Sequence, residues 1–336
     1  MRKKKVILKL ALSAAIVISY TLNAVGAGER IDQEFYIQSD EAQLYIKVRG
    51  QDINNPVLLY LHGGPGETYG PLLFQAYAGP ELEKHFVVGY LHQRSTCMSP
   101  DAPIETLILS KYVEDVGNTV EFLKDKFKKD KISLLGHSFG GGLGYLYLLE
   151  HQDNIEKFVS AAGAFSVSSV ENSGYQTVLE LSKKTGNQEA AKKLEDLGPP
   201  PYETLQEGMA WRRIGMEILD KMNEGLGKNL QMSKVITITE IDSIDPGWEN
   251  KSMVVVKAMY DELKTLDLEN RVNTIDVPML LIAGAKDILV PFSTLEKGYK
   301  NYGGQKEYFI LQKSNHMMFI DEPDLFVSKV IEFFQR

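Results

Sequence analysis

The stretch Gly136-His137-Ser138-Phe139-Gly140 determines how the rest of this sequence is interpreted. An apolar run at 131–135 precedes it, and helical spacing over about 141–150 follows it. The Gly-x-Ser-x-Gly spacing is typical of a serine on a sharp strand-to-helix turn, where small neighbours avoid steric clash. The pentapeptide alone is a weak signal, but its position between a strand and a helix predicts that Ser138 is a nucleophile.

A serine hydroxyl needs a base within hydrogen-bond reach, and the base needs an orienting acid. In the chain order Ser, Asp or Glu, His, only His151 and His316 are candidate bases, because the other histidines precede Ser138. His151 ends the helix that begins at the nucleophile, so it should point away. His316 follows the last predicted strand. Asp287 lies at the carboxyl end of the preceding strand, where catalytic groups gather. We therefore predict the triad Ser138, Asp287 and His316.

The distribution of apolar runs predicts an α/β fold. Short runs at 56–61, 86–91, 155–162, 277–283 and 307–311 are typical of strands buried on both faces, and alternating residues at 34–50 predict a hairpin. Amphipathic helical spacing is found at 112–127, between two of these runs, and at 322–336, after the last of them. Strands that alternate with helices indicate a mainly parallel sheet flanked by helices.

The alternation of predicted strands and helices stops at about residue 165, and mostly helical spacing follows to about 271. We predict an inserted helical cap at 165–272, between a first part of the core at 28–164 and a second part at 273–336.

The N-terminus carries a separate signal. Basic residues at 2–5, an apolar run at 6–22 and the small residues Val25-Gly26-Ala27 predict a signal peptide at 1–27. We therefore expect an exported protein that is secreted, periplasmic or associated with the cell envelope. Cleavage after Ala27 would remove five basic residues and no acidic one, which changes the formal charge from −8 to −13. The alternative is an uncleaved anchor that tethers the protein to the membrane.

Composition argues against several classes of function. The net charge of −8 and the lack of a basic patch argue against a nucleic-acid partner. Cys97 is the only cysteine, so an intramolecular disulfide and a cysteine-based zinc site are excluded. The six histidines are scattered and none belongs to a His-Glu-x-x-His pattern. We predict no metal and no cofactor.

Acyl transfer places negative charge on the substrate carbonyl oxygen, which two backbone N–H groups normally stabilise. One donor should belong to Phe139, the residue after the nucleophile. The other should come from the loop His62-Gly63-Gly64-Pro65-Gly66. We select Gly64 for this oxyanion hole, with Gly63 as the alternative. Gly63 and His137 are also candidates for substrate binding.

This glycine-rich loop resembles the signature of the prolyl aminopeptidase (proline iminopeptidase) branch of the α/β-hydrolases. That branch carries a second motif, Asp-Gln-Arg-Gly-x-Gly-x-Ser, after the next strand. The corresponding stretch here is His92-Gln93-Arg94-Ser95-Thr96-Cys97-Met98-Ser99. Gln93, Arg94 and Ser99 match, whereas His92, Ser95 and Cys97 depart from the pattern. The resemblance extends over the mature chain in layout, including the cap.

The resemblance implies a cofactor-free serine hydrolase acting on small molecules or short peptides, typically those with an N-terminal proline. Such a substrate requires a carboxylate to bind its ammonium group. The family commonly supplies one after a tryptophan pair in a cap helix, and Glu217 follows Ala210-Trp211 here, with Glu203 and Glu207 nearby. Glu217 is therefore a candidate amine anchor, although it lies a little further along than the family pattern places it; the alternative is that these cap carboxylates are simply solvated.

Two alternatives to an aminopeptidase stay open. A carboxylesterase or lactonase would keep the same catalytic groups and change the substrate, and an apolar cavity rather than a carboxylate pair would indicate it. A catalytically silent hydrolase fold used for ligand binding is disfavoured, because all three predicted triad residues are present.

Overall fold

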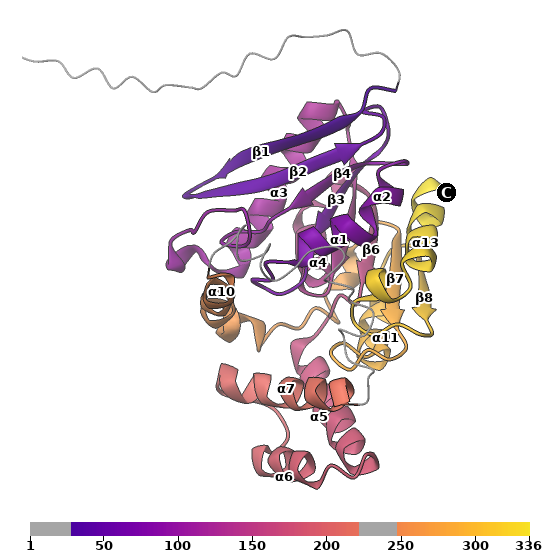
Figure 1. The fold of residues 1–336 in the computed structure, drawn as a ribbon. Helices are drawn as coiled ribbons and strands as arrows, with labels where there is room; N and C mark the ends of the chain where they lie inside the picture. Colours follow the sequence, from indigo (N-terminus) through magenta and orange to yellow (C-terminus); the bar gives the residue numbers. More distant parts are fainter. Residues whose placement is uncertain (1–27, 222–246) are drawn as a thin grey trace, which may run out of the picture.

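The structure is a computed structural model that describes residues 28–221 and 247–336 (Figure 1). The predicted signal peptide lies outside the described residues. The strands are β1 (Ile31–Ser39), β2 (Ala42–Gly50), β3 (Val57–Leu61), β4 (Val87–Leu91), β5 (Ile132–His137), β6 (Ile155–Ala161), β7 (Met279–Gly284) and β8 (Lys306–Leu311). The main helices are α1 (Gly70–Tyr77), α2 (Gly79–Leu82), α3 (Leu109–Phe127), α4 (Phe139–His151), α5 (Val167–Lys184), α6 (Gln188–Leu197), α7 (Leu205–Lys221), α10 (Trp248–Leu263), α11 (Phe292–Asn301), α12 (Met318–Asp321) and α13 (Pro323–Gln335).

All eight strands form one sheet in the order β1-β2-β4-β3-β5-β6-β7-β8. The predicted hairpin is present, because β1 pairs with β2 antiparallel and Asp40 turns between them with φ of 46°. β2 also pairs antiparallel with β4, whereas the strands from β4 to β8 are all parallel. The carboxyl ends of the parallel strands therefore meet at one edge of the sheet, which is where α/β folds bind their ligands.

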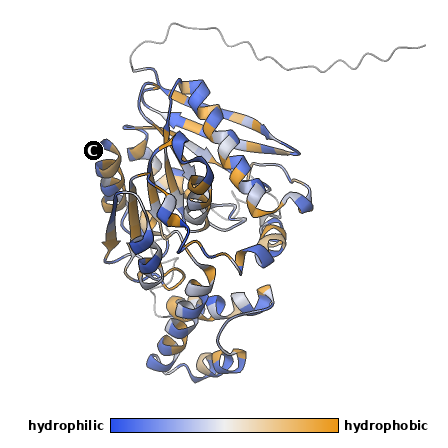
Figure 2. Cartoon of the chain, turned by 180° about the vertical axis from the view of Figure 1, so that it is seen from behind, coloured by the Kyte–Doolittle hydropathy of each residue, from blue (hydrophilic) through white to orange (hydrophobic). Residues whose placement is uncertain are grey.

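The short apolar runs form the centre of the core. Every residue of β3, β4, β5 and β7 is buried, as expected for parallel strands covered on both faces. Figure 2 shows these inner strands as mostly hydrophobic and the surrounding helices as mixed. One helix group consists of α1, α2, α12 and α13, and another contains α3 and α4, so the sheet is covered on both sides (Figure 1). The α/β prediction is confirmed.

The inserted helices leave the sheet between β6 and β7, which are neighbours in it. α5 packs against α6 and α7 (Figure 1). These three helices contribute most of a second apolar cluster, which includes Tyr175, Val178, Leu194 and Trp211 and also Ile288 from the loop after β7. The proposed boundaries of the cap at 165 and 272 stay predictions. Among residues 28–221 and 247–336, no helix is both long and apolar enough to cross a bilayer.

Candidate active site

Ser138 lies on a strained turn between β5 and α4. Its φ of 52° and ψ of −119° place a non-glycine residue where L side chains are rarely found. The Ser138 N–H donates to the Ala161 carbonyl at 2.8 Å, which fixes the turn against β6. A Cβ on Gly136 would lie 2.3 Å from the Gly140 carbonyl oxygen, and one on Gly140 would lie 2.1 Å from the Leu61 oxygen. Both flanking glycines are therefore required sterically.

Asp287 and His316 form a buried pair beside this turn. His316 Nδ1 lies 2.8 Å from Asp287 Oδ2, and the other carboxylate oxygen of Asp287 accepts from the Leu289 and Val290 N–H groups. Burial favours the neutral form of each group, but their mutual attraction outweighs it, so the pKa of His316 is raised and that of Asp287 is lowered. Nε2 of His316 has no hydrogen-bond partner among the described residues, which leaves it available for proton transfer.

Ser138 and His316 line one cavity of about 470 Å³ at the carboxyl edge of the sheet. Gly64 and Phe139 line the same cavity. Phe139 is the first residue of α4, and the helix provides no partner for its N–H. The predicted nucleophile, base and oxyanion donors are thus brought together, and Asp287 lies behind His316. Within residues 28–221 and 247–336 there is no group of three or more His, Cys, Asp or Glu residues suited to a metal.

Glu67 is a residue of this site that the sequence reasoning missed. It follows the glycine-rich loop, is partly buried and lines the cavity. Burial, opposed by His316 and by a hydrogen bond from the Gly63 N–H, raises the pKa of Glu67 to about 7. Gly63, the alternative oxyanion donor, therefore directs its N–H at a carboxylate, which leaves Gly64 as the better candidate. In the sequence this carboxylate directly follows the glycine-rich loop, and that position is the signal by which it could have been found.

His137 supports the site from within the protein. Its side chain is buried, and its Nε2–H donates to the His316 carbonyl oxygen at 3.0 Å. Burial, together with the neighbouring His316, lowers the pKa of His137 to about 3, so the ring is neutral. His137 was expected to bind substrate. It does border the cavity, but the hydrogen bond that its ring makes within the described part of the chain holds the loop that carries the candidate base.

The stretch from His92 to Ser99 is almost wholly buried and braces the glycine-rich loop. The Gln93 side chain donates to the His62 carbonyl oxygen at 2.8 Å, and the Gln93 N–H donates to the His62 ring at 3.1 Å. Ser95 and Cys97, where the resembling family has glycine, keep positive φ values of 56° and 48°. Both positions therefore have a left-handed backbone, a conformation that glycine adopts most readily.

Arg94 is the charged residue of that stretch, and it forms a buried ion pair with Asp115 of α3. The guanidinium is fully buried and donates to both carboxylate oxygens at 2.9 and 2.7 Å. Burial raises the pKa of Asp115, and the attraction of Arg94 opposes this. The pair fastens the second motif to α3 and does not border the cavity.

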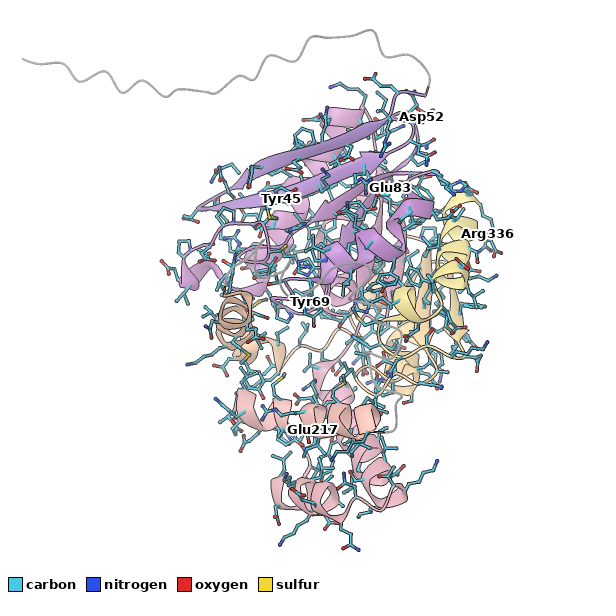
Figure 3. All side chains as sticks on the ribbon, viewed as in Figure 1. Tyr45, Asp52, Tyr69, Glu83, Glu217 and Arg336 are labelled. Atoms are coloured by element: carbon cyan, nitrogen blue, oxygen red, sulfur yellow. The ribbon has the colours of Figure 1, made fainter. Side chains whose placement is uncertain are left out.

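The prediction for Glu217 was wrong. Its side chain is exposed and does not line the cavity, and Figure 3 shows it on α7, apart from the cavity-lining Tyr69. Trp211 and Ile218 are buried in the apolar cluster of the cap helices. The face of α7 that carries them points inward, and Glu217 lies on the face that points outward. The cap instead presents Glu171 and Arg212 to the cavity, with 3.5 Å between Oε1 and Nη1.

This fold and this cavity define an α/β hydrolase. The alpha/beta hydrolase fold family matches residues 56–323, and the chain belongs to that family of hydrolase enzymes. It is similar to the probable aminopeptidase YbaC of Bacillus subtilis, at 24% identity over 84% of this chain and 90% of that protein. The proline iminopeptidase of Saccharolobus solfataricus is 25% identical to this chain over 90% of this chain and 93% of that protein. A proline iminopeptidase-related protein from Thermus thermophilus has a similar structure, with a TM-score of 0.60 at 18% identity over 90% and 96% of the two chains.

Proposed function

We propose that this protein is a serine hydrolase that forms an acyl-enzyme on Ser138. His316 removes the hydroxyl proton as Ser138 attacks a substrate carbonyl, and Asp287 stabilises the resulting imidazolium. The N–H groups of Phe139 and Gly64 bind the developing oxyanion. His316 then protonates the leaving group, and a water activated in the same way releases the product. The observation that carries the proposal is the strained Ser138 facing the same cavity as the Asp287-paired His316.

We propose further that the substrate is a small peptide from which the N-terminal residue is cleaved. Two curated relatives are named as a probable aminopeptidase and a proline iminopeptidase. A protonated N-terminus needs carboxylates in the cavity, and Glu67 and Glu171 both line it.

The test is a substrate panel together with active-site labelling. We expect a fluorophosphonate probe to label the wild type and not Ser138→Ala, and prolyl-p-nitroanilide to be cleaved faster than its N-acetylated form. His316→Ala should lose hydrolysis of these substrates. Its matched control, His151→Ala, should keep it, because His151 lies exposed at the far end of α4. A folded wild type that the probe leaves unlabelled would exclude the serine mechanism.

One observation favours an esterase as the second candidate. Much of the cavity lining consists of aliphatic and methionine side chains, which suit the acyl chain of a neutral ester; they include Leu143, Val170, Leu205, Met209, Val256 and Met317. Cleavage of p-nitrophenyl butyrate combined with no cleavage of any free-amine amide would favour this assignment.

We also propose export, on the strength of the basic residues at 2–5 and the apolar run that follows. Mass spectrometry of the protein recovered from its native host should give an N-terminus at Gly28. An intact residue 1 in the membrane fraction would favour the anchor, and an intact residue 1 in the cytosol would refute export.

A further inference from the structure

We infer that Glu67, which lines the cavity, is the specificity-determining residue that binds the substrate's ammonium group beside Ser138. The inference rests on the proposed peptidase function and assigns its amine-binding site to the glycine-rich loop instead of the cap.

The position of the carboxylate carries the inference. A Cβ placed on Gly63 would lie 2.6 Å from Glu67 Oε2 and 3.3 Å from Ser138 Cβ. The carboxylate and the nucleophile therefore both lie close to one position that glycine leaves empty. A Cβ on Gly70 would also lie 2.7 Å from the same oxygen. Glycines on two elements thus make room for this carboxylate next to the candidate nucleophile.

The substrate imposes a matching distance. In an aminoacyl group the α-nitrogen lies about 2.5 Å from the carbonyl carbon, because only Cα separates them. The carbonyl carbon must approach the serine oxygen to about 3–3.5 Å before attack. An anchor for the ammonium therefore has to lie within a few ångströms of Ser138. Glu67 meets this condition.

The charge balance of the cavity favours the same residue. No lysine or arginine among the described residues forms an ion pair with Glu67, and its one described donor is the Gly63 N–H. His316 can offset the charge of Glu67 only while it is protonated. When His316 is neutral, as the catalytic base must be, an ionised Glu67 in a largely apolar cavity is costly, and a substrate ammonium would supply a positive charge. Glu171, the other carboxylate there, already has Arg212 as its partner.

Direct binding separates this inference from the proposed mechanism. In a Ser138→Ala background, which cannot turn over substrate, isothermal titration calorimetry measures the Kd of L-prolinamide and of neutral N-acetylprolinamide. We expect prolinamide to bind more tightly than the acetylated probe, and the added change Glu67→Gln to weaken prolinamide about 100-fold. The ratio of kcat/KM for prolyl-p-nitroanilide to that for p-nitrophenyl butyrate should fall by a similar factor in Glu67→Gln alone.

Glu217→Gln is the matched control and should leave the Kd of prolinamide unchanged, because Glu217 lies outside the cavity. Glu67→Asp keeps the charge, is the second variant if Glu67→Gln fails to fold, and should lose less affinity than Glu67→Gln. The inference is overturned if Glu67→Gln leaves the Kd within threefold, if both probes bind equally well, or if only Glu171→Gln weakens prolinamide. Fluorophosphonate labelling of the wild type tests the serine mechanism separately.

Discussion

Gly140→Ala tests whether the turn at Ser138 is as tightly packed as the structure indicates. The new Cβ would meet the Leu61 carbonyl oxygen at 2.1 Å and the His62 oxygen at 2.6 Å. Both obstacles are backbone atoms at the end of a buried strand, so no side chain can rotate to relieve the clash. Gly117→Ala in α3 is the matched control, because its nearest contact would be a ring carbon of Tyr147 at 3.6 Å.

The two substitutions should have opposite signs. Replacing a helical glycine by alanine stabilises by about 0.5–1 kcal/mol when space allows, which is the expectation for Gly117→Ala. Overpacking a rigid site costs about 1–3 kcal/mol or more, so Gly140→Ala should be destabilised by about 2 kcal/mol net. At about 2 °C per kcal/mol, the melting temperature should fall by about 4 °C for Gly140→Ala and rise by about 1–2 °C for Gly117→Ala.

Differential scanning calorimetry of the two variants and the wild type measures both effects. Hydrolytic activity should also fall in Gly140→Ala, because the displaced His62 carbonyl begins the loop that carries the oxyanion donor. A Gly140→Ala protein that melts at or above the wild-type temperature and retains full activity would refute the close packing of α4 against β3.

Three further outcomes are expected. The kcat/KM of the wild type should rise with pH as His316 loses its proton, with a midpoint above the ordinary 6.5, because Asp287 raises the pKa of His316. In Asp287→Asn the midpoint should move to lower pH and the rate should fall about 10³–10⁴-fold. A midpoint that does not move would contradict the pairing of Asp287 with His316. Asp115→Asn should lower the free energy of unfolding in urea by about 3 kcal/mol, because it leaves the Arg94 guanidinium buried without a counter-charge; a loss below 1 kcal/mol would argue against that pair. The thiol of Cys97 is buried, so it should react with Ellman's reagent only after denaturation, and rapid reaction of the native protein would contradict its burial.

Much of the fold could be predicted because its determinants are local. Buried strands appear as short apolar runs, and the hairpin appears as alternation around Asp40. The short helices α1 and α2 were not predicted, since their apolar residues show no clear period over so few turns. Glu217 was misplaced because the resemblance fixed a position along a helix, whereas the packing of Trp211 and Ile218 decides which face of α7 points outward.

For the site, the chemistry of the candidate triad and its order along the chain could be predicted from the residues alone. Ser138, Asp287 and His316 each follow a recognisable strand, and the ends of parallel strands must meet at one edge. Which charges share the cavity depends instead on how distant segments pack. Glu67 and Ser138 both lie beside Gly63, and the Glu171–Arg212 pair lines the same cavity from the cap. Such contacts join segments far apart in sequence, and their distances depend on the packing of helices and loops, which no local pattern of residues records.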